Sequence, residues 1–440
     1  MRVNRLQPRP HTRQSLMLLA GLLCVVLFSF GCERDSPERG RVVLVGLDGV
    51  SPRLVDYLMA RGALPNFSRL AKAGVFGPLR SEGPLFSPRI WNSIATGKSP
   101  EKHGIEFFVT QRASGTGLRL FDSTDRRVHA LWNIVSDAGL EVGVVNWWNT
   151  YPPEKINGAM VSDHVLPRAV AERTQMADES PEAATPCCFP ISWENRVGLL
   201  IEREGPLTAF ADPFADETVW PPLWQPKRLS HVFAEDDAIM RMAIDVDEQL
   251  QPDLLMVFLP GIDRVSHRLW GGFEIREGHE DAWPYGEAER RMAREALFEY
   301  YEYTDALLGQ LIDRYGKNDL VMVVSDHGFE SPHRPGIAEN TGTHVSEEAI
   351  DGVLFARGPG VPHLRFEGGV SIYDVTPTIL SWLGIPPALD MDGRSVAFLK
   401  SAPLKLVATH DVGSIDRLEA VPSGAEEEII MQLRGLGYIE

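Results

Sequence analysis

Two aspartates and a histidine follow apolar runs of this 440-residue sequence, at the points where buried strands would end. Asp48 comes directly after Arg41–Leu47, and Asp326 and His327 come after Leu320–Val324. Apolar runs of this length are typical of strands buried on both faces of a parallel sheet. Charged groups at such a strand end are costly unless hydrogen bonds or a metal ion satisfy them. The three side chains are therefore candidate metal ligands, although an aspartate such as Asp48 can also cap a helix or start a turn.

A second pair of candidate metal ligands, Asp263 and His267, follows the apolar run Leu254–Leu259. Their spacing of four residues places both side chains on one face of a helical turn, where they can hold one metal ion. A surface ion pair is the alternative interpretation. His344 lies further along the chain in the glycine-containing segment Gly342-Thr343-His344. A single histidine is usually structural, so His344 becomes a candidate ligand only together with the other residues.

Ser87 is the candidate nucleophile. It precedes Pro88 and an apolar pattern that includes Trp91 and Ile94, and we expect it to be the N-cap of a helix whose first residue is the proline. A hydroxyl at this position lies among free backbone N–H groups at the positive end of the helix dipole. That location favours a bound phosphoryl group and stabilises an alkoxide. An ordinary capping serine is the alternative.

Strands and helices alternate along most of the chain, which predicts an α/β fold. We expect a doubly wound, mostly parallel sheet with helices on both faces. In such sheets ligands bind beyond the carboxyl ends of the strands, where all the candidate residues would meet. The expected strands are 41–47, 142–145, 254–259, 320–324 and 353–356, and the expected helices are 54–60, 131–138, 288–315 and 373–383.

Residues 41–400 are expected to form one domain that carries the candidate site. A proline-rich stretch without periodicity, at about 167–229, interrupts the alternation of strands and helices. We interpret it as an insertion that forms a cap over the site, with a poorly ordered linker as the alternative. Residues 401–440 are interpreted as a C-terminal extension, in which 425–438 has the spacing of an amphipathic helix that docks on the surface.

The first 32 residues predict export and a membrane anchor. Four arginines precede the apolar stretch Leu16–Phe30, which is short for a membrane span, and Cys32 follows it closely. The pattern resembles the lipobox of bacterial lipoproteins, in which the cysteine becomes the lipidated N-terminus, and residues 33–40 would then be a linker. A signal anchor that is not cleaved is the alternative. Both interpretations place the protein in the cell envelope outside the cytoplasm, facing the periplasm or the cell surface.

Composition and charge exclude some functions. Hydrophobic residues make up 44% and charged residues 24% of the chain, as in ordinary globular proteins. The formal charge is −18, and without residues 1–32 it is −22, from 39 basic against 61 acidic residues. Such a surface repels nucleic-acid backbones, so we expect no nucleic-acid binding, and bound metal ions would have to attract an anionic substrate. The adjacent Cys187 and Cys188 are either buried thiols or a vicinal disulfide.

From about Arg41 to Leu399 the sequence resembles the alkaline phosphatase superfamily, and within it the type I phosphodiesterases and nucleotide pyrophosphatases. The matching segments are VVLVGLDG, SPRIWNSIATGKSPEKHGI, PGIDRVSH, VVSDHGF and GTH. The resemblance implies a hydrolase with two zinc ions, for which Mn²⁺ or Fe²⁺ are the alternatives, and with Ser87 as nucleophile and further metal ligand. One zinc ion would be held by Asp263, His267 and His344, and the other by Asp48, Asp326 and His327.

The resemblance also implies the reaction, which is hydrolysis of phosphodiester or pyrophosphate bonds through a phosphoseryl intermediate on Ser87. The displacement at phosphorus would be in line, between the two metal ions. Nucleotide pyrophosphatases usually have an asparagine three residues after the nucleophile, where this chain has Ile90, so nucleotides are less expected as substrates. Arg89 or Asn92 would then contact the phosphate. Trp148 and Tyr151 would line the pocket of the leaving group.

Several other functions share this fold. The sulfatase pattern Cys/Ser-x-Pro-x-Arg is absent, because Pro88 and Arg89 follow Ser87 directly. A phosphomonoesterase would need extra positive charge for a dianionic phosphate, and a phosphotransferase would act on a component of the cell envelope. A non-catalytic envelope lipoprotein is the alternative from another class, and the complete set of six ligands argues against it. The expected substrate is thus a small-molecule or envelope phosphoester.

Overall fold

The computed structural model describes residues 40–439 apart from 113–116, 174–185, 204–206, 211, 213, 215, 217–219, 221–228, 276–285, 333–340, 399–403, 420–422 and 437. The described residues belong to one unit, Gly40–Glu440, and the predicted export signal with Cys32 lies outside them. Within this part of the chain, no helix combines the length and the apolar character needed to cross a membrane.

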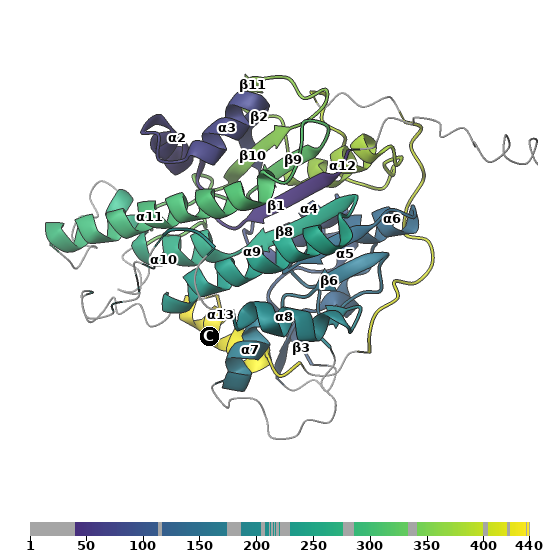
Figure 1. Ribbon diagram of the computed structural model, residues 1–440, viewed down its shortest axis with the longest axis horizontal. Helices are drawn as coiled ribbons and strands as arrows, with labels where there is room; N and C mark the ends of the chain where they lie inside the picture. Colours follow the sequence, from purple (N-terminus) through teal and green to yellow (C-terminus); the bar gives the residue numbers. More distant parts are fainter. Residues whose placement is uncertain are drawn as a thin grey trace, which may run out of the picture. The chain divides into compact units, whose positions relative to one another are not determined.

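A nine-stranded mixed sheet is the framework of the fold (Figure 1). Its strand order is β11-β2-β10-β9-β1-β8-β5-β6-β7, and the neighbours from β9 to β6 are all parallel. Strand β10 is antiparallel to both β2 and β9, and β7 is antiparallel to β6. The predicted mostly parallel sheet is therefore confirmed. The strands are β1 Val42–Leu47, β2 Val75–Arg80, β5 Val142–Val145, β6 Gly158–Val161, β7 Cys188–Phe189, β8 Leu254–Leu259, β9 Leu320–Val324, β10 Asp351–Arg357 and β11 Leu364–Arg365, and the separate pair is β3 Val109–Gln111 with β4 Leu118–Leu120.

The sequence of β1 explains its central position. Every residue of Val42–Leu47 is apolar or glycine and is buried. Because side chains alternate along a strand, Val43 and Val45 join the core on one face of the sheet, and Val42 and Leu44 join the core on the other. A strand with two apolar faces is stable only with helices on both sides.

Helices cover both faces of the sheet, as predicted. Figure 1 shows α9 and α11 crossing in front of the central strands. The face of Val43 packs against α2 Pro52–Ala60, α3 Pro65–Ala73, α7 Val165–Arg173, α8 Trp193–Ile201, α9 Ser230–Leu250, α10 Gly261–Phe273 and α11 Glu287–Ile312. The face of Val42 packs against α4 Ser87–Thr96, α6 Leu131–Asp137 and α12 Val375–Leu383. The remaining helices are α5 Pro100–His103, α13 Glu426–Leu436 and the short 3₁₀ turns η1 Ser123–Asp125 and η6 Ile372–Asp374.

The predicted cap at 167–229 is only partly described. Strand β7 pairs with β6 at the edge of the main sheet, and α8 packs against α9. Phe214 and Trp220 are buried in the core of the Val43 face. β7, α8, Phe214 and Trp220 thus belong to the sheet and its core, and a cap over the site stays a prediction. Cys187 and Cys188 are free, buried thiols, and burial raises the pKa of both.

Candidate active site

Three adjacent parallel strands, β9, β1 and β8, bring acidic residues to one edge of the sheet. Asp48 follows β1 directly, and Asp326 is the second residue after β9. Asp263 lies in the first turn of α10, which begins two residues after β8. Ser87 begins α4 beyond β2, and β2 runs in the same direction as β9 because both are antiparallel to β10. All four side chains therefore lie beyond the carboxyl ends of strands, where the sequence places them.

The first group of metal-ligating side chains consists of Asp48, Asp326 and His327. The Nε2 atom of His327 lies 3.6 Å from Asp48 Oδ1 and 3.4 Å from Asp326 Oδ2. All three residues are buried, and one donor atom from each can face a common ion.

The second group consists of Asp263, His267 and His344. Asp263 Oδ1 lies 3.5 Å from His267 Nε2 and 3.7 Å from His344 Nε2, and the two imidazole nitrogens are 3.2 Å apart. The main chain of α10 positions the loop that carries His344, because the amides of Thr341 and Gly342 both donate to the carbonyl of His267. The six ligands implied by the resemblance thus fall into the two sets of three that it assigns.

Unsatisfied buried atoms test whether metal ions fit these two groups. Asp48 Oδ1, Asp263 Oδ1 and Asp326 Oδ2 have no hydrogen-bond partner among the described residues, and neither does His327 Nε2. Buried polar atoms nearly always have a partner, and a metal ion would supply one here. The imidazole of His267 donates from Nδ1 to the carbonyl of Gly342, at 3.2 Å. This bond leaves Nε2 with its lone pair toward the centre of the group, so the donor set fits a metal ion.

The pKa shifts of these side chains also indicate that metal ions fit the two groups. Burial raises the pKa of Asp263 to about 6 and that of Asp326 to about 7. Burial, followed by the negative charges of Asp326 and Asp263, raises the pKa of Asp48 well above its usual value. Burial lowers the pKa of His267 to about 3 and that of His344 well below the ordinary value, so both imidazoles are neutral at pH 7. The folded chain concentrates acidic groups at a place that disfavours their charge, and divalent cations would compensate for this.

Ser87 is the first residue of α4, and Phe86 occupies the capping position with extended backbone. The prediction that Ser87 is the N-cap was therefore wrong by one residue. Proline is tolerated anywhere in the first helical turn because its missing N–H has no partner there, so Pro88 does not fix the start of the helix to a single residue. The hydroxyl still lies at a helix N-terminus, and Ser87 lines the same pocket as Asp48 and Asp263.

The pocket beside Ser87 has both polar and apolar lining residues. Its space, including the part open to solvent, amounts to about 820 Å³. Asp48, Ser87 and Asp263 are among its polar lining residues. The other described lining residues include Phe108, Leu120, Phe121, Asn146, Trp148, Asn149, Asp163, His164, Phe258, Arg264, Ile429, Gln432, Leu433 and Tyr438.

The four predicted substrate-binding residues have different environments. Trp148 lines the pocket, whereas Tyr151 is buried and stacks on His164 with ring centroids 4.4 Å apart. Asn92 is fully buried and donates to Asn149 Oδ1 at 2.7 Å, which ties α4 to the loop after β5. Arg89 is half-buried, and its guanidinium is 3.5 Å from the carbonyl of Gly83. None of Arg89, Asn92 and Tyr151 is among the described residues that line the pocket.

The loop after β5 contributes two asparagines that sequence reasoning did not select. Asn146 and Asn149 both line the pocket and have positive φ angles, 58° and 56°. Asparagine adopts this left-handed conformation more readily than most other residues. The signal was present in the sequence, because Asn146-Trp147-Trp148-Asn149 follows a buried strand at the edge where ligands bind.

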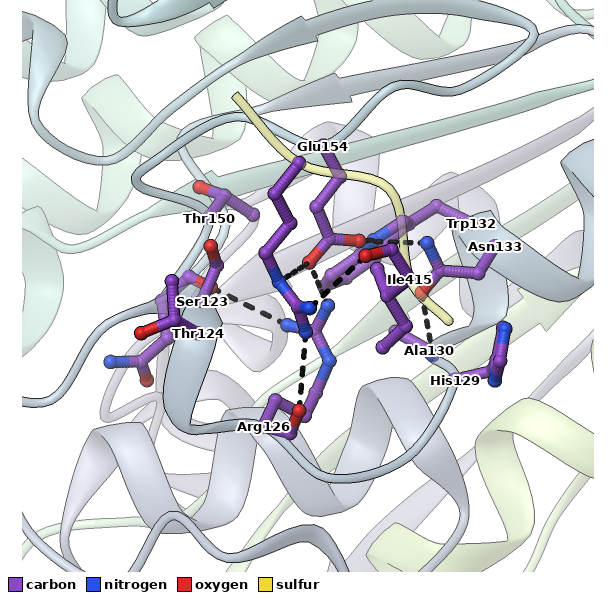
Figure 2. Close-up of polar contacts among 12 residues, drawn as sticks. Ser123, Thr124, Arg126, His129, Ala130, Trp132, Asn133, Thr150, Glu154 and Ile415 are labelled. Atoms are coloured by element: carbon purple, nitrogen blue, oxygen red, sulfur yellow. Dashed lines mark hydrogen bonds and ion pairs between the residues drawn. The ribbon is translucent and has the colours of Figure 1, made fainter. Parts of the chain in front are cut away.

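A buried polar network contacts the backbone of this loop. Figure 2 shows Glu154 with the side chains of Arg126, Trp132 and Asn133 pointing toward it. Glu154 Oε2 accepts hydrogen bonds from Trp132 Nε1 and Asn133 Nδ2, both at 2.7 Å, and Oε1 pairs with Arg126. Arg126 also donates to the carbonyl of Asn149 at 3.4 Å. The ion pair therefore fixes the backbone that presents Asn149 to the pocket.

The C-terminal segment reaches further into the site than predicted. Helix α13 is present where an amphipathic helix is expected, but Ile429, Gln432 and Leu433 line the pocket. Beyond the helix, the hydroxyl of Tyr438 lies 2.9 Å from His267 Nε2 and 2.8 Å from His344 Nε2. The apolar face of the segment thus packs on the site, and amphipathic spacing alone does not say which surface a helix covers.

The chain is a phosphoester hydrolase of the alkaline phosphatase superfamily by its family match, and its fold and edge-of-sheet centre of carboxylates and imidazoles agree with this. The family model described as type I phosphodiesterase / nucleotide pyrophosphatase matches residues 42–366. The chain therefore belongs to that family.

One of the similar solved structures supports the fold. A putative sulfatase from Bacteroides thetaiotaomicron VPI-5482 is 14% identical with a TM-score of 0.52, and the match covers 83% of this chain and 77% of that one. The phosphonate monoester hydrolase SpPMH from Silicibacter pomeroyi is 18% identical with a TM-score of 0.46 over the same shares. Phosphonoacetate hydrolase from Sinorhizobium meliloti 1021 is 19% identical with a TM-score of 0.42, over 67% of this chain and 58% of that one. A comparison with curated proteins gave no match.

Proposed function

We propose that the chain hydrolyses phosphodiester bonds, with Ser87 as the nucleophile and two zinc ions held by the six Asp and His side chains. One observation carries the proposal, namely that Ser87 lines the same pocket as Asp48 and Asp263, one ligand from each group. Three imidazoles among six ligands favour zinc over a hard cation such as Mg²⁺.

The bound zinc ions supply Lewis acidity, which lowers the pKa of the attacking hydroxyl and neutralises charge on the phosphate. Ser87 Oγ attacks phosphorus, the bond from phosphorus to the first alcohol breaks, and Ser87 becomes esterified to the rest of the substrate. The first alcohol leaves with the electron pair of the broken bond and takes up a proton. Water then attacks the same phosphorus, which releases a phosphomonoester and restores the hydroxyl of Ser87. The N-terminus of α4 directs its backbone N–H groups toward the anion during both steps.

The charge of the pocket favours a diester over a monoester. Among its described lining residues, Arg264 is the one Lys or Arg, and its guanidinium pairs with Glu235 and contacts Gln432. A dianionic monoester would require additional positive charge. A diester carries one negative charge, and its second substituent can pack on apolar lining residues such as Trp148 and Phe258. We therefore expect at least one apolar or aromatic substituent on the substrate.

The test compares bis-p-nitrophenyl phosphate with p-nitrophenyl phosphate for the zinc-loaded protein. The proposal predicts faster cleavage of the diester and a loss of about 10³-fold or more in Ser87→Ala with unchanged zinc content. Ser68→Ala, a change at a half-buried serine on α3, is the matched control and should retain full activity. A faster rate with the monoester would reject the diester preference, and an active Ser87→Ala protein would reject the nucleophile.

A further inference from the structure

The hydroxyl of Tyr438 lies within hydrogen-bond distance of both imidazoles of the Asp263/His267/His344 group. Zinc in proteins prefers four donors in a tetrahedron, and with bonds of about 2.0–2.1 Å the donors are about 3.3 Å apart. The three ligands of this group are separated by 3.5, 3.7 and 3.2 Å. Tyr438 Oη is 2.9 and 2.8 Å from the two imidazole nitrogens, within about 0.5 Å of the separation expected for two donors on one ion.

Other contacts hold the tyrosine in this place. Helix α10, which carries Asp263 and His267, also carries the two arginines that bind the C-terminal segment. Arg264 donates to Gln432 Oε1 at 3.2 Å, and Arg268 donates to the carbonyl of Gly435 at 2.7 Å. Each arginine directly follows a metal ligand in the sequence, so the same turns of α10 position both the ligands and the tail.

The aromatic ring of Tyr438 is also packed. It lies 4.6 Å from the ring of Phe108, and Leu433 is buried in the same small apolar cluster with Phe108 and Leu120. The ring of His267 contacts Tyr438 edge to face, with centroids 5.5 Å apart. The hydroxyl is therefore aimed at the imidazoles by its own packing.

We propose that Tyr438 is a fourth protein ligand of the metal ion held by Asp263, His267 and His344, and that phosphate and this hydroxyl compete for the same coordination position. Coordination replaces the O–H···N contacts by an oxygen–metal bond, and the phenolic proton passes to solvent. The proposal rests on the metal centre of the proposed function but not on Ser87 as the nucleophile. Tyr438 lies beyond residues 42–366, so it is not part of the segment that the family model matches.

The test measures zinc affinity by competition with a chelator, using the full chain and its Tyr438→Phe variant. The variant keeps the ring and removes the donor, and we expect the affinity for one of the two zinc ions to fall by about 10-fold or more. The visible spectrum of the cobalt(II)-loaded protein, which depends on the number and type of donors, should change as well. Tyr57→Phe on α2, where the tyrosine is 41% exposed, is the control and should change neither readout.

Inorganic phosphate distinguishes a metal ligand from a phosphate-binding hydroxyl. Removal of a competing ligand should tighten the binding of phosphate to the zinc-loaded variant, whereas removal of a hydroxyl that binds phosphate should weaken it. Zinc affinity within about twofold of the parent, an unchanged cobalt spectrum, or weaker phosphate binding would each overturn the role of Tyr438. These results leave the proposed function standing, because that proposal fails on a different result, an active Ser87→Ala protein.

Discussion

His327 Nε2 lies 4.0 Å from Asp263 Oδ1, although the two residues belong to different metal-binding groups. The rings of His327 and His344 also stack, with centroids 3.9 Å apart. The two groups are thus joined into one centre. In two-metal hydrolases, ions about 3.5–4 Å apart hold the attacking and the leaving oxygen of one displacement.

Removal of Asp263 should therefore disturb both metal ions. We expect Asp263→Asn to reduce the zinc content from about two ions per chain to one or fewer and to lower diesterase activity by about 10²-fold or more. Metal analysis after dialysis measures the first effect. Asp56→Asn, at a surface residue paired with Arg365, is the control. Two tightly bound zinc ions in Asp263→Asn would contradict its role as a ligand.

Zinc affinity should rise with pH, most steeply below about pH 7. Zinc binds the ionised carboxylates, and protons compete for Asp263 and Asp326, whose pKa values are raised to about 6 and about 7. Affinity should therefore increase most steeply from pH 5 to about pH 7, and above that only through the proton that Tyr438 would release on coordination. His267 does not compete in this range, because burial lowers its pKa to about 3, and the lowered pKa of His344 acts in the same direction. Chelator competition between pH 5 and 8 measures this, and an affinity that is constant over the range would speak against it.

Glu154 should matter for stability and for the pocket. Glu154→Gln removes the charge opposite Arg126 while both side chains stay buried, and breaking a buried ion pair costs about 3–5 kcal/mol. We expect the free energy of unfolding in urea to fall by this amount. Because Arg126 also contacts the carbonyl of Asn149, KM for the diester should rise more than kcat falls. Arg80→Gln, at an exposed pair with Glu347, should change stability by less than about 1 kcal/mol.

Asp236 should make stability depend on pH. Burial raises its pKa to about 7, and its Oδ2 accepts a hydrogen bond from the hydroxyl of Tyr300 at 2.9 Å. The folded chain binds this proton more tightly than the unfolded chain, whose carboxyl has a pKa of about 3.9. The resulting stabilisation is fully present below about pH 4 and is lost as the pH rises toward 7.

Asp236→Asn cannot ionise and keeps an acceptor for Tyr300. Between pH 5 and 8, its free energy of unfolding should decline by about 3 kcal/mol less than that of the parent. Urea denaturation at several pH values measures the difference. Identical pH profiles for the two proteins would show that Asp236 does not carry this effect.

The membrane anchor remains a proposal, because Cys32 lies outside the described residues. If the lipobox acts as its sequence suggests, the protein expressed in a bacterium with a lipoprotein pathway should incorporate labelled palmitate and sediment with membranes. Cys32→Ala should abolish the label, whereas Cys24→Ala in the apolar stretch should not. A labelled Cys32→Ala protein would reject the assignment.

The sheet and the metal ligands could be predicted from sequence because both depend on local patterns. The strands β5, β8 and β9 have the predicted bounds. A strand that is covered on both faces is apolar along its whole length, so the apolar run in the sequence marks where the strand begins and ends. Asp48, Asp263 and Asp326 follow the adjacent strands β1, β8 and β9 by one, four and two residues, so topology alone brings these three carboxylates together.

Residues whose position depends on tertiary packing could not be predicted in this way. Tyr438 meets His267 only because α13 docks on this part of the surface, and the amphipathic pattern of 425–438 does not name its partner. Tyr151 and Trp148 have similar sequence surroundings, but only Trp148 lines the pocket, because the ring of Tyr151 packs on His164. Contacts between distant segments decided both outcomes.

The most direct measurement is the isolation of the covalent intermediate. The zinc-loaded protein is mixed with a diester substrate, quenched in acid during turnover, digested and analysed by mass spectrometry. The account predicts a phosphate ester on the peptide that contains Ser87, and its absence both in Ser87→Ala and in the metal-free protein. Steady turnover with unmodified Ser87, or a phosphate ester on a different residue, would contradict the account.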